Sequence, residues 1–294
     1  MKNSSKYVLA VFASGCLWGT MGYFRRALGA LGLDSFGIVC LRCAIAAVLF
    51  AVTILLTDPS AFRVRWKDAW CFLGSGIFSL LFFSSCYFQA MTLMSLSVAA
   101  ILLYTAPCFV MLMSAVLFRE KLTRRKVLAM VLAFAGCCLV SGIVGDDVRL
   151  TLTGFLYGLG SGFGYALYSI FGKLAMARGY RSNTVNLYSC LLAALGAGIL
   201  WGFSGPVQVL TASGSNFLFS LLTAVVTTFL PYLLYTYGLS GIEAGAASVI
   251  ASVEPVVATV VGLVVFGEPL SVFSVVGIAL VLAAIVLLNT GSQT

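Results

Sequence analysis

The chain has 294 residues, of which 61% are hydrophobic and only 9% are charged. A soluble domain carries about 25% charged residues, and a water-facing surface must be polar, so this composition excludes a soluble enzyme or binding domain. The net charge of +8 does not require a nucleic-acid partner, because basic cytoplasmic loops give a membrane protein the same excess. The composition therefore predicts an all-α integral membrane protein.

Ten apolar runs are long enough to cross about 30 Å of hydrocarbon as helices. The first run is predicted to be a retained helix rather than a signal peptide, because it is too long for a signal's apolar core and is followed by Arg25 and Arg26. The ten predicted spans are residues 7–27, 35–57, 69–90, 96–118, 126–144, 152–174, 183–203, 216–238, 245–266 and 272–289.

The basic residues predict the orientation of these spans. With the N-terminus in the cytoplasm, the outer loops hold only Arg25, Arg26 and Arg149, and Arg42 lies within a span. This bias predicts a multi-pass protein of the plasma (inner) membrane with both termini in the cytoplasm. The basic residues assigned to the inner side are Lys2, Lys6, Arg63, Arg65, Lys67, Arg119, Lys121, Arg124, Arg125, Lys126, Lys173, Arg178 and Arg181.

The sequence repeats itself after about 148 residues. Residues 1–145 and 150–294 are therefore predicted to be two five-helix repeats, and because five is odd the second repeat is inverted relative to the first. Inverted repeats around a central cavity are typical of secondary transporters. The aligned pairs are Tyr87/Tyr235, Ala99/Ala247, Pro107/Pro255, Phe118/Phe266, Glu120/Glu268 and Leu122/Leu270, joined at a shift of 147 by Ser14/Ser161, Gly15/Gly162 and Phe24/Phe171.

The nine cysteines are predicted to be small buried hydrophobic residues. Cys40 and Cys43 have a C-x-x-C spacing, but the chain has no histidine and no second matching pair. We therefore expect no metal site and no cofactor.

Several short motifs, duplicated at matching positions, resemble the EamA-like branch of the drug/metabolite transporter (DMT) superfamily. The resemblance covers nearly the whole chain. It is carried by Trp18-Gly19 in the first span, by Pro107 and Pro255, by the helix-ending segments 118–122 (FREKL) and 266–270 (FGEPL), and by Gly136 and Gly277 in the spans that follow.

This resemblance implies two inverted five-helix halves around a cavity lined by the first, third, fourth, sixth, eighth and ninth spans. It also implies that the fifth and tenth spans are peripheral and often form a homodimer contact. Members of the family move amino acids, other metabolites, amines or drugs, mostly outward and commonly in exchange for protons. The chain departs from a strict repeat where Ala106-Pro107 stands opposite Glu254-Pro255.

Two ionisable side chains fall deep within the predicted spans, Arg42 and Glu254. Such residues usually face a cavity or one another. Glu254 is predicted to bind a cationic or amino group of the substrate and to exchange a proton; the structural alternatives are capping of backbone groups near Pro255 or a fixed pair with Arg42. Arg42 is predicted to be a counter-ion for substrate or a structural residue that reaches the outer headgroups.

Prolines and aromatic residues supply the other candidates. Pro107 and Pro255 each remove a backbone hydrogen bond within a span, and their equivalent positions favour gating kinks. Aromatic walls suit amphipathic or cationic substrates, although Tyr and Trp also gather at membrane interfaces. The remaining predicted substrate-binding residues are Trp18, Tyr87, Tyr104, Tyr165, Tyr168 and Tyr235.

The glycine-rich run 158–164 contains overlapping G-x-x-x-G spacings and predicts close helix packing rather than a phosphate loop, because no Gly-Lys-Ser/Thr follows it. The sequence as a whole predicts a secondary active transporter, a proton-coupled exporter of small metabolites such as amino acids or related amines. The alternatives are an uncoupled facilitator or uptake carrier for a small polar or cationic metabolite, and a scaffold or sensor that transports nothing. An enzyme is not expected, because the chain has no histidine and only one deep carboxylate.

Overall fold

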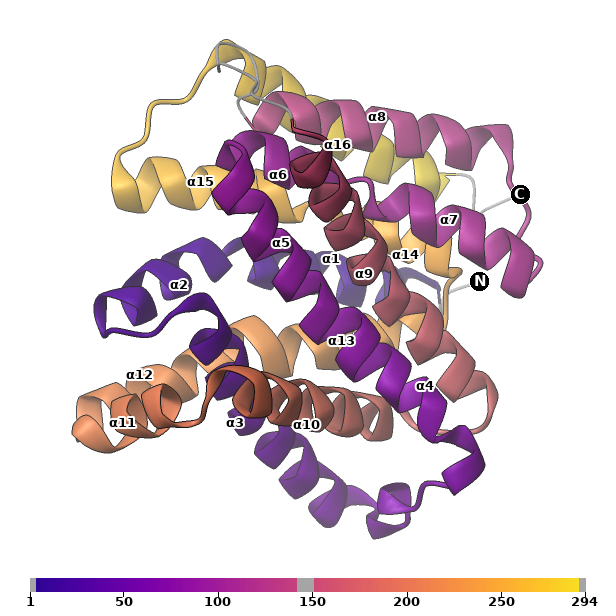
Figure 1. Ribbon diagram of the computed structural model, residues 1–294. Coiled ribbons are helices and arrows are strands. Elements are labelled where there is room, and N and C mark those ends of the chain that lie inside the picture. Colours follow the sequence, from indigo (N-terminus) through magenta and orange to yellow (C-terminus); the bar gives the residue numbers. More distant parts are fainter. Residues whose placement is uncertain (1–3, 142–150, 291–294) are drawn as a thin grey trace.

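The computed structural model describes residues 4–141 and 151–290. The predicted loop positions of Lys2 and Arg149, and the predicted boundary between residues 145 and 150, lie outside the described residues. Within the described ranges the regular structure is helical and contains no strand (Figure 1). Seven of these helical segments are long and apolar enough to cross a membrane: Ser5–Ala30, Ser35–Thr57, Trp66–Leu93, Leu96–Leu117, Ser182–Trp201, Gly214–Leu239 and Ala244–Phe266.

Several of the apolar segments consist of more than one helix. The helices of the first half are α1 (Ser4–Gly19), α2 (Met21–Ala30), α3 (Ser35–Thr57), α4 (Ala69–Leu73), a π-helical segment (Gly74–Leu81), α5 (Phe82–Leu93), α6 (Leu96–Leu103), α7 (Ala106–Leu117) and α8 (Arg124–Val140). Those of the second half are α9 (Leu152–Ala177), α10 (Ser182–Trp201), α11 (Ser204–Ala212), α12 (Gly214–Ala224), a second π-helical segment (Val225–Phe229), α13 (Leu230–Leu239), α14 (Ala244–Ala251), α15 (Glu254–Phe266) and α16 (Val272–Thr290).

The two prolines expected to kink continuous helices instead lie where one helix ends and another begins. Pro107 is the second residue of α7 and Pro255 is the second residue of α15. Proline is tolerated in the first turn of a helix because the N–H it lacks has no partner there. The breaks follow α6 and α14, 148 residues apart, and a further break at Thr20 separates α1 from α2.

The helices pack in pairs that join the two halves of the chain. Figure 1 shows α8 beside α16 at one side of the molecule and α10 beside α3 at the opposite side. A methyl group added at Gly136 of α8 would lie 2.7 Å from the carbonyl oxygen of Gly277 in α16, so these two backbones are in direct contact. Between the two pairs, α1 contacts α13 and α5 contacts α9.

The glycine-rich run of α9 is where this helix approaches the first half most closely. A methyl group at Gly158 would lie 2.3 Å from the side chain of Leu102, and one at Gly162 would lie 2.7 Å from the carbonyl oxygen of the same residue. A methyl group at Gly164 would meet the backbone of Phe83 at 3.0 Å. Larger residues at these positions would push α9 away from α5 and α6.

Substituting two glycines of α9 tests this packing. Gly162→Ala should lower the unfolding free energy by about 1–3 kcal/mol, because backbone atoms of α6 cannot yield to the added methyl group. Gly172→Ala is the matched control: its new methyl group would meet nothing closer than 3.8 Å, so the change should be neutral or stabilise by up to about 1 kcal/mol. Thermal unfolding of both variants in the same detergent measures the difference, and equal effects would contradict the close approach.

Candidate functional site

A cavity of about 430 Å³ lies between the two halves of the chain. Its inner wall comes from α1, α3, α5, α9 and α15. Its mouth is lined by Arg25 in the middle of α2 and by residues at or next to the ends of other helices, among them Ser35, Ser97, Ser141 and Glu268.

Glu254 is the first residue of α15 and lines the inner part of this cavity. The hydroxyl of Tyr165 donates a hydrogen bond to Glu254 Oε2 across 3.3 Å. Its position places the carboxylate at the positive end of the α15 dipole, which favours a negative charge. Within the described part of the chain no cationic nitrogen lies within 4.0 Å of this carboxylate, so the fixed pair with Arg42 is not formed.

Arg42 lines the same cavity from α3 and is only 7% exposed. Its Nη1 donates a long hydrogen bond of 3.4 Å to Thr228 Oγ1, and its buried Nε has no hydrogen-bond partner among the described residues. Burying a cation normally requires a charged or strongly polar partner. Arg42 is therefore a cation with unused donors on the wall of the cavity.

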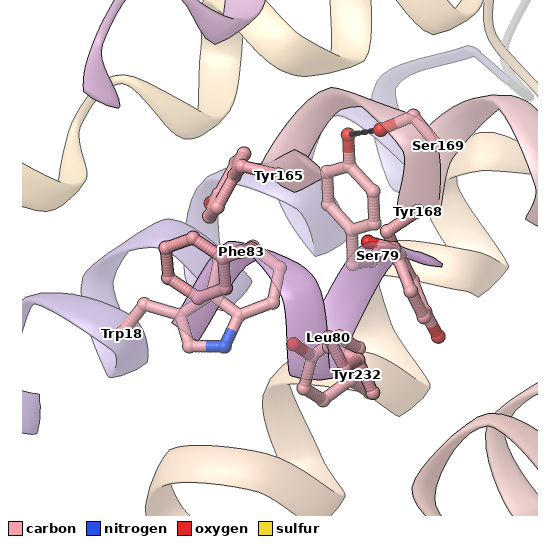
Figure 2. Close-up of a pocket in the computed structure, with 9 residues that line it drawn as sticks. Trp18, Ser79, Leu80, Phe83, Tyr165, Tyr168, Ser169 and Tyr232 are labelled. Atoms are coloured by element: carbon pink, nitrogen blue, oxygen red, sulfur yellow. Dashed lines mark hydrogen bonds between the residues drawn. The ribbon is translucent and has the colours of Figure 1, made fainter. Parts of the chain in front are cut away.

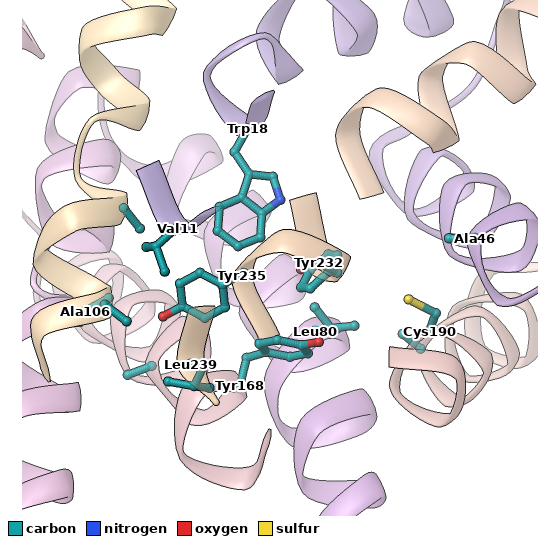
Figure 3. Packing of buried hydrophobic residues seen from close by; sticks show 14 of the residues in the cluster. Val11, Trp18, Ala46, Leu80, Ala106, Tyr168, Cys190, Tyr232, Tyr235 and Leu239 are labelled. Atoms are coloured by element: carbon teal, nitrogen blue, oxygen red, sulfur yellow. The ribbon is translucent and has the colours of Figure 1, made fainter. Parts of the chain in front are cut away.

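Aromatic rings close the inner end of the cavity around Trp18. The Trp18 ring lies 5.2 Å from the ring of Tyr232, 5.3 Å from Tyr235 and 6.2 Å from Tyr165, measured between centroids. Figure 2 shows these side chains around a smaller pocket that adjoins the main cavity, and Figure 3 shows how Trp18, Tyr232 and Tyr235 continue into the buried core.

Hydrogen bonds fix two of these tyrosines within the second half. The Tyr235 and Ser169 hydroxyls are 2.7 Å apart, drawn as a dashed line in Figure 2. The Tyr168 hydroxyl donates to Asn186 Oδ1 across 2.6 Å. Their polar tips are thus occupied by protein groups, and their rings belong to the buried core, since Tyr168 is 5% and Tyr235 3% exposed.

The candidate residues from the sequence are distributed over three adjoining pockets. Tyr168 and Tyr235 line the smaller pocket of Figure 2. Pro107 lies in a third pocket together with Tyr104, Tyr165 and Glu254. The main cavity is lined by Trp18, Arg42, Tyr87, Tyr104, Tyr165, Glu254 and Pro255.

Several residues that line these pockets were not assigned to the substrate site from the sequence, and three of them are polar or charged residues near the predicted ones. Tyr232 lines both the main cavity and the smaller pocket, and Arg25 and Glu268 line the mouth. Tyr232 lies three residues before Tyr235, so helical periodicity could have placed the two on one face. Glu268 was recognised in the repeated helix-ending segment 266–270, but nothing local in the sequence places Glu268 or Arg25 at the mouth of a cavity.

Ion pairs between the two halves close the end opposite the mouth. Among residues 4–141 and 151–290, four such pairs join a residue of the first half to one of the second. They are Asp58–Arg181 at 2.6 Å, Asp68–Arg178 at 3.3 Å, Glu120–Lys173 at 2.6 Å, and Lys126–Glu243. These ion pairs hold the two halves together at this end.

Glu120 is the most buried member of this closure, with its side chain 8% exposed. Besides the bond from Lys173 Nζ, its carboxylate accepts hydrogen bonds from the backbone N–H groups of Ala244 at 2.9 Å and Gly245 at 3.3 Å, the first residues of α14. Burial by itself would raise the pKa of Glu120, but the bonds from Lys173 and Ala244 outweigh burial and hold the pKa below its usual value.

A related contact recurs at the open end. Arg26 pairs with Glu268 at 2.9 Å and lies over the ring of Phe266, as Lys173 pairs with Glu120 and lies over the ring of Phe118. The two sets are separated by 147 or 148 residues. The outer pair differs in exposure, since the side chains of Arg26 and Glu268 are 57% and 53% exposed.

Comparison with known proteins gives matches along nearly the whole chain. The model of the EamA-like transporter family matches residues 5–142 and again 152–290. An uncharacterized transporter of Archaeoglobus fulgidus is 31% identical over 287 residues, covering 97% of this chain and 98% of that protein. The uncharacterized transporter YxxF of Bacillus subtilis is 26% identical and covers 97% of this chain and 90% of its own.

A crystal structure with 20% sequence identity superposes with a TM-score of 0.83 and covers 98% of each chain. At this identity the likeness concerns the fold alone. It supports the arrangement of helices described above along nearly the full length.

Replacing Glu120 tests the closed end. Glu120→Gln should lower the unfolding free energy at pH 7 by roughly 1–3 kcal/mol, because a buried charge-assisted bond to Lys173 is lost. A carboxyl whose folded pKa is depressed stabilises the protein above its unfolded pKa of about 4.3, and this contribution is lost as the pH falls through the folded value. Thermal unfolding between pH 7 and pH 3 should therefore show a smaller acid-induced loss for the variant than for the wild type.

Glu268→Gln is the matched control for this prediction. Its exposed ion pair should contribute less than about 1 kcal/mol. If both variants lower the unfolding temperature equally, Glu120 does not have the special role in closure that its burial indicates.

Proposed function

The chain belongs to the EamA-like transporter family, within the DMT superfamily, and from this premise we propose that it is a proton-coupled secondary transporter that exports small metabolites such as amino acids or related amines. The observation that carries the proposal is the polar cavity between the two halves. It reaches Glu254, opens at one end and is closed by ion pairs at the other.

We propose ten spans in two inverted five-helix repeats, residues 1–145 and 150–294, in the inner membrane with both termini in the cytoplasm. Three helices, α8, α9 and α16, would add to the seven segments whose length and hydropathy suffice on their own. Support for the repeat comes from contacts that recur at a spacing of 147 or 148 residues, such as Lys173–Glu120 and Arg26–Glu268. Under this topology the ion-paired end of the cavity is cytoplasmic and its mouth faces outward.

The two ends of the cavity have related contacts, but one end is closed and the other is open, and this difference supports a mechanism of alternating access. A transporter must expose one site to each side in turn, and inverted repeats achieve this when the halves exchange conformations. The breaks at 104–105 and 252–253 give each half a short helix that can tilt independently of the helix after it. We propose that Pro107 and Pro255 mark these gating positions, since each begins the second of the two helices.

The cavity chemistry favours a substrate with an amino group. Glu254 offers a carboxylate beside the ring of Trp18 and the hydroxyl of Tyr165. A protonated amine can pair with the carboxylate and lie against aromatic faces, an attraction worth about 0.5–2 kcal/mol. A proton competes for the same carboxylate, so binding of one excludes the other. This competition at a single site is sufficient to couple export of an amine to entry of a proton.

The role of Glu254 is tested in proteoliposomes loaded with labelled L-leucine or isoamylamine. An imposed pH gradient should accelerate efflux from wild-type vesicles. Glu254→Gln should lower efflux at least about tenfold, because the charge that binds the amine is lost, and the remaining flux should not respond to the gradient. Asp34→Asn is the control: it removes a carboxylate outside the cavity but keeps an N-cap acceptor for α3.

Two outcomes would contradict parts of this proposal. Flux that persists in Glu254→Gln with its pH dependence intact would remove Glu254 from proton coupling. Flux in the wild type that ignores the pH gradient would favour an uncoupled facilitator.

A further inference from the structure

We propose that Arg42 binds the carboxylate of the substrate, so that the cavity selects α-amino acids with an apolar side chain over the corresponding amines. This inference rests on the proposed function and narrows its substrate class. The transport proposal requires only Glu254, whereas the present one requires opposite charges at two places in one cavity.

The burial and the incomplete hydrogen bonding of the Arg42 guanidinium are the first observation that supports this proposal. It is 93% removed from solvent, since the residue is 7% exposed, yet its hydrogen bonding among the described residues consists of one long bond to the neutral hydroxyl of Thr228. A structural arginine at such a depth is expected to pair with a carboxylate. No acidic oxygen lies within 4.0 Å of Arg42 in the described chain. The partner of Arg42 is therefore an anionic ligand that binds reversibly.

The residue type fits a carboxylate in particular. The planar guanidinium presents parallel N–H donors that match the two oxygens of a carboxylate. The Nε of Arg42 is a buried donor without a partner, and pairing it with a substrate oxygen would remove a cost that the empty cavity bears. A substrate that is only a cation would leave this donor unsatisfied.

The placement of the two charges is the second ground. Arg42 lies on α3, and its neighbour Thr228 lies in the π-helical segment Val225–Phe229; Glu254 begins α15, and its neighbour Tyr165 lies on α9. Both charges line one cavity without forming an ion pair. A zwitterion can bridge such a separated pair, with its ammonium group at Glu254 and its carboxylate at Arg42.

The rest of the cavity wall favours an apolar side chain. The wall of the same cavity also includes Ile38, Val39, Phe83, Leu103 and Tyr104. A side chain with a further charge would find its partner only at the mouth, where Arg25 and Glu268 lie.

Two matched sets of probes test the assignment on purified full-length protein in nanodiscs. One set is L-leucine, isoamylamine and 4-methylpentanoate; the other is L-phenylalanine, phenethylamine and 3-phenylpropanoate. Dissociation constants from isothermal titration should favour each amino acid over its amine at least about tenfold, because a site built for a polar group rejects an analogue without it. Arg42→Gln should abolish this ratio while amine binding persists.

Two further variants complete the test. Arg42→Lys keeps the positive charge but loses the parallel N–H donors of the guanidinium. It should therefore fold even if Arg42→Gln does not, and it should retain only part of the preference for the amino acid over the amine. Arg25→Gln is the matched control, since this second cavity arginine already donates to Ser35 Oγ at 3.2 Å, and it should leave the ratio unchanged.

Amines that bind wild type as tightly as amino acids would overturn the role of Arg42, as would a ratio that survives Arg42→Gln or disappears in Arg25→Gln. The proposed function would still stand if Glu254→Gln weakened the binding of every amine-bearing probe. If no probe binds and none is transported, the proposed function falls as well.

A separate observation, at the mouth of the cavity, carries a second inference. We propose that Glu268 closes the mouth by binding the N-terminal N–H groups of α6, as Glu120 already binds those of α14. It rests on alternating access but not on the identity of the substrate.

Besides the other ion pairs of the closed end, the bonds of Glu120 to α14 have no counterpart at the mouth among the described residues. Glu120 accepts from Lys173 and from the N–H groups of Ala244 and Gly245. The residues 148 positions earlier are Leu96 and Ser97, the first residues of α6, and both line the mouth together with Glu268.

Glu268 already pairs with Arg26. Within the described residues, its carboxylate makes no hydrogen bond to Leu96 or Ser97. The mouth therefore has the same kinds of group as the closed end: backbone N–H donors at Leu96 and Ser97 and a carboxylate acceptor at Glu268. In this structure no hydrogen bond joins them. A carboxylate at a helix N-terminus is favourable for both the orphan N–H groups and the helix dipole, which gives the movement a driving force.

Hydrogen exchange measured by mass spectrometry tests this movement in nanodiscs. Glu120→Gln weakens the closed end, so peptides covering Ala244 and Gly245 should exchange faster than in wild type, while peptides covering Leu96 and Ser97 should exchange at least about tenfold more slowly as they gain a partner. Adding Glu268→Gln to this variant should restore fast exchange at residues 96–97. Lys173→Met weakens the same closure from its other side and serves if Glu120→Gln does not fold.

Unchanged exchange at residues 96–97 while residues 244–245 become faster would overturn the proposed closure by Glu268. So would slow exchange that persists in the double variant. Neither result bears on whether the cavity transports a substrate.

Discussion

The bilayer requires every backbone polar group in its interior to find a partner within the protein, and this chain breaks helices at three places within its apolar segments. Breaks after α1, α6 and α14 leave helix ends that lipid cannot satisfy. Such ends are tolerated only where they are buried in protein or line a polar cavity. The position of the cavity, and the presence of Glu254 at the start of α15, follow from this requirement.

The structure places charged residues of the two halves at three locations: inside the cavity, at its mouth and at the opposite end. Arg42 and Glu254 supply one charge of each sign inside the cavity, Arg25 and Glu268 stand at its mouth, and the remaining ion pairs described here hold the opposite end together. A charge buried without a partner is costly, and this cost at Arg42 and Glu254 is the physical reason for proposing a ligand that carries charges of its own.

The composition and the spacing of apolar runs were sufficient to predict a helical membrane protein, because hydrophobicity over some 20 residues is a property of the local sequence. The matched prolines also pointed correctly to two irregular positions, although as breaks between helices rather than kinks, since a proline pattern does not reveal whether the helix before it has already ended. The break at Thr20 has no proline, and no local sequence pattern predicts it.

The sequence was sufficient to predict several residues of the candidate site, but not which contacts they make. Glu254 and Arg42 were recognisable because ionisable residues within apolar runs are rare. The bonds of Glu120 to α14 were not recognisable, since they join residues 124 and 125 positions apart and depend on how the two halves meet. Tyr232 was not assigned to the substrate site for a similar reason: among the many tyrosines of the chain, only the three-dimensional packing selects those that face Trp18.

The ion pairs at the two ends of the cavity differ in number and in exposure, so dissolved salt affects the two ends differently. Dissolved ions weaken the attraction between partly exposed opposite charges, over a Debye length of about 8 Å at physiological ionic strength. The exposed pair Arg26–Glu268 at the mouth is therefore weakened most by salt, whereas Asp58 and Asp68, in the pairs at the other end, are only 23% and 10% exposed and are screened less. Salt on the side of the mouth would thus weaken the contact there more than salt on the opposite side weakens the closed end.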